Sequence, residues 1–110
     1  MNENTVRSLV RVGKRLKKLA LANKGLISMK VNVFHRVEVH ITNEALAEII
    51  KNHSDWTIVD RYPGEDCPES SYRWQATIAV DDVEFFTLGN VDDFEKVGMH
   101  VPSEISEVGE

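Results

Sequence analysis

The strongest constraint on this chain is residues 72–88, in which apolar and polar side chains alternate almost without interruption. Such alternation places the apolar side chains on one face of a β-strand. Asp81 and Asp82 interrupt the pattern, and a two-residue turn at these positions sets Val80 opposite Val83 on the same face. The stretch therefore predicts a β-hairpin with one apolar face, although Asp-Asp is a weaker turn signal than Asp-Gly.

A second alternating stretch covers residues 30–41 and predicts one long strand. Its apolar face carries Val31, Val33, His35, Val37, Val39 and Ile41, and its polar face carries Asn32, Phe34, Arg36, Glu38 and His40. A histidine on an apolar face is more often a hydrogen-bonded core residue than a ligand. We therefore expect His35 to lie in the core, whereas the row on the opposite face is either solvated or available to a ligand.

Helix-capping residues and turn-forming residues predict the remaining helices, strand and loop. Thr42 precedes a helix over residues 43–53 whose charges match the helix dipole, and residues 56–62 read as a short strand. Residues 63–71 form a loop by composition, and residues 91–97 form a helical turn or an edge element. The helix between two strands is expected to cross one face of the sheet.

Residues 5–23 carry apolar side chains at three- and four-residue spacing and predict a basic amphipathic helix, with Thr5 as a candidate N-cap. Such a helix either packs its apolar stripe on the domain or a neighbouring subunit, or binds nucleic acid, an anionic membrane surface or an acidic partner. We favour the packing interpretation.

Together these elements predict an α+β fold: the N-terminal helix, then β-α-β-β-β with a mainly antiparallel sheet covered on one face by helices. The expected division is a basic helix and linker over residues 1–28, an α+β core over 29–98 and an acidic tail over 99–110. Met29 is also a conceivable internal start. The length of 110 residues fits one domain.

Charge is divided unequally along the chain. Residues 1–30 hold eight basic residues against one acidic, a net charge of about +7, and the rest holds 17 acidic against five basic, about −12. This asymmetry suggests either a basic arm attached to an acidic body, or an arm that docks on its own body or on a neighbouring subunit. For assembly we favour a homo-oligomer in which the basic helix of one copy docks on the acidic surface of another. The N-terminus lacks a secretory pattern, Cys67 has no disulfide partner, and no apolar run is long enough for a membrane span, so we expect a cytoplasmic protein.

Catalytic and cofactor motifs are missing. The sequence contains no phosphate-binding loop, dinucleotide fingerprint, CxxC, HExxH or GxSxG motif. Cys67 lies among acidic residues, which disfavour its thiolate, and lacks neighbouring ligands for zinc. We therefore expect neither an enzyme nor a cofactor nor a metal site, although His40 with Glu38 offers minimal acid–base groups.

The candidate binding residues come from the polar positions of the long strand and the hairpin, which converge if the two elements pair. They are Phe34, Arg36, Glu38, His40, Arg73, Gln75 and Phe86. We expect a non-enzymatic accessory or inhibitory protein of bacterial or phage type that contacts a partner protein or a small anionic ligand through this polar face. The alternative is a regulator that imitates nucleic acid with its acidic body or binds nucleic acid through its basic helix. Direct nucleic-acid binding is disfavoured by the acidic body, which repels phosphates.

Overall fold

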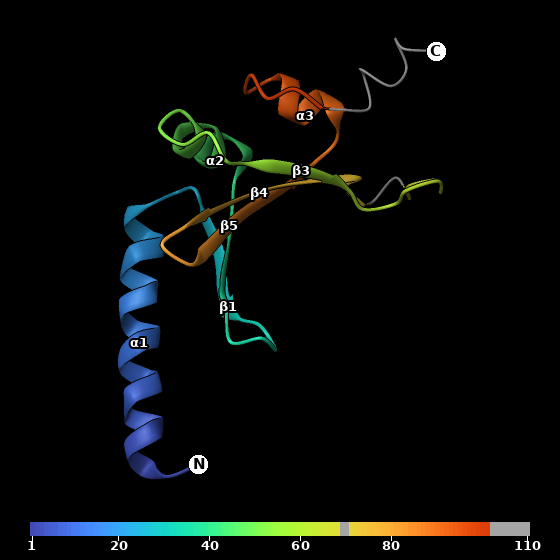
Figure 1. Cartoon of the computed structure of the whole chain (residues 1–110). Coiled ribbons are helices and arrows are strands. Elements are labelled where there is room, and N and C mark those ends of the chain that lie inside the picture. Colours follow the sequence, from blue (N-terminus) through green and yellow to red (C-terminus); the bar gives the residue numbers. More distant parts are fainter. Residues whose placement is uncertain (69–70, 102–110) are drawn as a thin grey trace, which may run out of the picture.

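The structure, a computed structural model, describes residues 1–68 and 71–101 and contains three helices and five strands within them (Figure 1). The helices are α1 (Glu3–Ala22), α2 (Asn43–Ile50) and α3 (Val91–Glu95). The strands are β1 (Leu26–Val31), β2 (Val37–Ile41), β3 (Thr57–Asp60), β4 (Trp74–Val80) and β5 (Val83–Gly89). The strands form a single sheet in the order β1-β2-β5-β4-β3.

The predicted hairpin is the centre of this sheet. β4 and β5 pair antiparallel with Val80 opposite Val83, so the two-residue turn and the register are confirmed. Asp81 and Asp82 have φ angles of 48° and 66°, which is the left-handed backbone of a type I′ turn. This turn matches the right-handed twist of the flanking strands and holds the two strands in register.

The predicted long strand over residues 30–41 is wrong, because the chain reverses in its middle and forms the β1–β2 hairpin. The Oδ1 of Asn32 accepts hydrogen bonds from the backbone N–H groups of Phe34 and Arg36, and His35 has a φ of 60°. An asparagine side chain that bonds the backbone two residues on initiates a turn. His35 is therefore an exposed turn residue and not a core histidine.

The alternation concealed this turn for a simple reason. Val31 pairs with Val37 across the hairpin, and paired residues of antiparallel strands lie on the same face of the sheet. The loop between them has an odd number of residues, so the period-two pattern continues through the loop without a change of phase.

The α+β class, the N-terminal helix and the mainly antiparallel sheet are confirmed. β2 runs parallel to β5, whereas the other three pairs are antiparallel, so the sheet is mixed. The parallel pair follows from the connection through α2, which carries the chain from β2 to β3 at the far edge.

Two helices cover one face of the sheet and complete the core. Leu46 of α2 and Phe94 of α3 are fully buried. They pack against the inward side chains of β2 and β4, which include Val39, Ile41, Trp74, Ala76 and Ile78. Met99 and Val101 are buried in the same cluster, so the packed chain extends past the boundary expected at residue 98. The rest of the expected tail, residues 102–110, lies outside the described residues.

Helix α1 stands beside the sheet instead of on it (Figure 1). Its N-cap is Asn2, whose side chain accepts a hydrogen bond from the backbone N–H of Thr5, so the cap expected at Thr5 is displaced by three residues. Leu16 is half-buried and every other residue of the helix is exposed. Residues 1–68 and 71–101 therefore leave the apolar stripe of α1 uncovered.

Candidate functional site

The candidate site is the face of the sheet opposite α2 and α3, which we call the open sheet face. Strand registers place alternate residues of all five strands on it. These residues are Ser28, Lys30, Glu38, His40, Thr57, Val59, Gln75, Thr77, Ala79, Glu84, Phe86 and Leu88. None of them is fully buried, so the face is accessible to a ligand or a partner.

An aromatic pair lies at the centre of this face. His40 of β2 and Phe86 of β5 are neighbours across the parallel pair, and their rings stack with centroids 4.7 Å apart at an angle of 9°. Partial burial lowers the pKa of His40, because an imidazolium loses hydration there. The histidine is therefore neutral near pH 7 and contributes a flat, weakly polar surface.

Ion pairs line the end of the face nearest the β1–β2 turn. The parallel register sets Glu38 beside Glu84, and two adjacent carboxylates repel each other. The Nζ of Lys30 lies 3.6 Å from the Oε2 of Glu38, and the Nη1 of Arg36 lies 3.5 Å from the Oε1 of Glu84. Each acid is thus paired with a cation from the neighbouring turn or strand. These pairs are partly exposed, so each stabilises the fold by at most about 1 kcal/mol.

The structure brings together most of the residues predicted from the sequence. Glu38, His40, Gln75 and Phe86 share the open sheet face, and Arg36 joins it through Glu84. Phe34 is 79% exposed, but it lies in the β1–β2 turn and not on a strand.

Arg73 does not join this group. It lies at the opposite end of β4 from Arg36, where its guanidinium donates two hydrogen bonds of 3.0 Å to Asp60. A further bond of 3.2 Å reaches the carbonyl of Tyr62. These bonds lower the pKa of Asp60, chiefly through the hydrogen bond from Arg73. Arg73 therefore connects the start of β4 to Asp60 at the end of β3.

Sequence reasoning missed Lys30, Thr77 and Leu88 as members of the face. Lys30 was assigned to the same predicted strand as Glu38, and only the hairpin places it opposite Glu38 on a neighbouring strand. Asn32 was the available signal, because its side chain forms the turn that separates the two strands.

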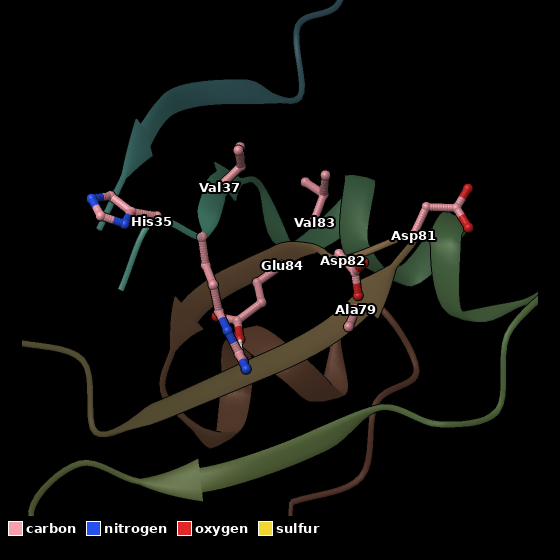
Figure 2. Close-up of a pocket in the computed structure, with 8 residues that line it drawn as sticks. His35, Val37, Ala79, Asp81, Asp82, Val83 and Glu84 are labelled. Atoms are coloured by element: carbon pink, nitrogen blue, oxygen red, sulfur yellow. Dashed lines mark ion pairs between the residues drawn. The ribbon is translucent and has the colours of Figure 1, made fainter. Parts of the chain in front are cut away.

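A pocket of about 530 Å³ lies where the two hairpin turns meet (Figure 2). Its charged lining comprises Arg36, Asp81, Asp82 and Glu84. The Nη1 of Arg36 lies 3.5 Å from the Oε1 of Glu84, so the arginine is already engaged by a carboxylate. The pocket is therefore predominantly acidic and disfavours an anionic ligand.

Two negative findings concern residues 1–68 and 71–101. No three of their histidine, cysteine, aspartate or glutamate side chains are grouped so that they could hold a metal ion. No helix in this part of the chain combines the length and hydrophobicity needed to cross a bilayer.

Comparisons with protein-family models, with curated proteins and with solved structures gave no match to this chain.

Proposed function

We propose that this chain is a non-enzymatic binding protein that acts by stoichiometric contact with a partner protein through its open sheet face. The observation that carries the proposal is the composition of that face. An aromatic stack of His40 on Phe86 lies at its centre, and charged pairs lie toward its end. Protein interfaces have the same plan, with aromatic residues enriched in the core and charged residues at the rim.

The flatness of the site favours a protein over a small ligand. Small-molecule sites are concave and bury most of the ligand surface. The open sheet face instead offers side chains that project in parallel from neighbouring strands. The charged lining of the adjoining pocket is mainly acidic, and Arg36, the cation in that lining, is paired with Glu84. A small anionic ligand is therefore the weaker of the two alternatives.

The proposal is tested by a substitution that blocks the face without removing core packing. Thr77 lies beside Phe86 across the β4–β5 pair and is half-buried, so Thr77→Arg adds a bulky charge at the centre of the face. Asn52→Arg is the matched control, because it makes the same charge change at an exposed position after α2. The assay is affinity capture from the source cells followed by a binding titration with the purified partner.

We expect wild type and Asn52→Arg to bind the partner equally and Thr77→Arg to bind at least tenfold more weakly. Circular dichroism must show that all three proteins are folded. Equal binding by all three proteins would contradict the proposal.

The basic helix supports a second candidate, a nucleic-acid-associated regulator. Six of the residues of α1 are basic and one is acidic, and all seven are exposed. In that case binding to duplex DNA falls steeply with salt, because bound counterions are released. Binding by α1 is then insensitive to Thr77→Arg, which separates the two candidates.

A further inference from the structure

Exposed apolar side chains are concentrated in the N-terminal third of the chain. The described residues expose 14 large apolar side chains, and 12 of them lie within residues 1–34. The same stretch holds eight basic residues and one acidic residue, whereas the rest of the chain is acidic. Exposed apolar area and positive charge therefore coincide, which indicates an interaction surface for an anionic partner.

Helix α1 carries most of this surface, with its apolar and basic side chains on opposite sides. Successive residues are rotated by about 100° around the helix axis, which assigns five apolar residues to one side and five basic residues to the other. The apolar stripe comprises Val6, Leu9, Val12, Leu16 and Leu19. The basic side comprises Arg7, Arg11, Lys14, Arg15 and Lys18. A helix divided in this way is suited to the boundary between water and an apolar phase.

The rest of the described chain leaves both sides of α1 largely free. Leu9 and Val12 are 54% and 62% exposed, and Leu16 alone in the helix is half-buried. The ion pair that α1 forms within the described residues joins Arg7 to Glu3 of the same helix, at 3.7 Å. The other five basic side chains of α1 have no carboxylate within ion-pair distance in this part of the chain.

The position of α1 keeps the acidic body away from an anionic partner. Residues 23–25 connect the helix to β1, and Figure 1 shows the N-terminal end of the helix directed away from the sheet. The 20 residues of α1 span about 30 Å. The Debye length at physiological salt is only about 8 Å, so the charges of the body are screened from the first turns of the helix.

We propose that α1 binds the surface of a lipid bilayer that contains anionic lipids. The helix lies in the plane of the interface, with its apolar stripe at the level of the acyl chains and its basic side toward the headgroup phosphates. The β1–β2 turn, which points toward the N-terminal end of α1 in Figure 1, supplies a second apolar contact. In that turn Val33 and Phe34 are 86% and 79% exposed.

The apolar stripe selects a bilayer over nucleic acid. Phosphates of nucleic acid would neutralise the basic side but leave the stripe in water, and α1 contains no aromatic residue on which a base could stack. An anionic bilayer neutralises the charge and covers the stripe at the same boundary. Each cation near such a surface increases the affinity about fivefold.

The first test removes part of the stripe without a change in charge. Leu9→Gln replaces an exposed apolar side chain of the stripe, and Asn4→Gln is the matched control on the polar side of the same helix. Binding of each full-length protein is measured by co-sedimentation with vesicles of phosphatidylcholine, alone or mixed with phosphatidylglycerol. We expect Leu9→Gln to bind the mixed vesicles at least fivefold more weakly than wild type, because about half of a leucine side chain no longer enters the bilayer. Asn4→Gln is expected to bind as wild type does.

The second test removes charge. Lys14→Gln/Lys18→Gln removes two cations from the basic side, and Lys51→Gln/Lys96→Gln removes two from exposed positions of the body. We expect the first variant to bind the mixed vesicles about 25-fold more weakly and the second to bind them as wild type does. Wild type is expected to bind mixed vesicles at least tenfold more tightly than neutral ones. Circular dichroism must show that every variant is folded.

Four results would overturn the proposal. The first is a wild type that does not bind mixed vesicles, and the second is equal binding to both kinds of vesicle. The third is a Leu9→Gln variant that binds as wild type does, which indicates adsorption by charge alone. The fourth is tighter binding of wild type to duplex DNA than to mixed vesicles, with Leu9→Gln unaffected, which indicates nucleic acid as the partner. Thr77→Arg is expected to retain vesicle binding, because it alters the open sheet face and not α1, so this test is independent of the proposed function.

Discussion

The turn between β4 and β5 provides a sharp test of the fold, because two aspartates there adopt a backbone that L-residues avoid. Asp81 and Asp82 have positive φ angles. The left-handed conformation costs an L-residue about 1–2 kcal/mol, and the short polar side chain of aspartate reduces this cost. Glycine avoids the strain but loses more entropy on folding, about 0.5–1 kcal/mol. Asp82→Gly also removes one of two adjacent negative charges. We therefore expect Asp82→Gly to stabilise the fold by about 0.5–1 kcal/mol.

The measurement is the urea midpoint together with the thermal midpoint of the full chain. A gain of 1 kcal/mol raises the melting temperature of a domain near this size by about 4 °C. Asp66→Gly is the matched control, because it removes the same charge from a loop position without a positive φ. It is expected to give no gain. The reasoning is refuted if Asp82→Gly melts at or below the wild-type temperature, or if Asp66→Gly gains as much.

Three further predictions concern the core and the titrating groups. Leu46→Ala is expected to lower the free energy of unfolding by about 2–5 kcal/mol in urea denaturation, because Leu46 is fully buried; an unchanged midpoint contradicts this packing. Burial lowers the pKa of His40 below 6.5, so the unfolded chain binds that proton more tightly and stability falls as pH drops through about 6.5; His40→Gln is expected to flatten the urea midpoint across that range. Arg73 lowers the pKa of Asp60 below 3.8, so this stabilisation is present above about pH 4 and is lost as pH falls further; Asp60→Asn is expected to destabilise the protein at pH 7 and to match wild type more closely at pH 3.

The position of β2 shows why the candidate site was only partly predictable. Pairing of the polar rows was expected if residues 30–41 met the hairpin, and β2 does pair with β5. The neighbours within that pairing depend on the crossover through α2, which makes the pair parallel. His40 therefore stacks on Phe86, and Glu38 lies beside Glu84. Arg73 lies apart from the other candidate residues, where it donates hydrogen bonds to Asp60.

The local elements could be predicted from the order of residues alone: the amphipathic helix over α1, the capped helix α2, and the β4–β5 hairpin with its two-residue turn. Periodicity and turn chemistry act between neighbouring residues, so they are readable along the chain. The tertiary structure sets which face of the sheet stays open, and it leaves the stripe of α1 uncovered by the described residues. These properties depend on contacts between segments far apart in sequence, whose pairing a period-two or period-3.6 pattern does not specify.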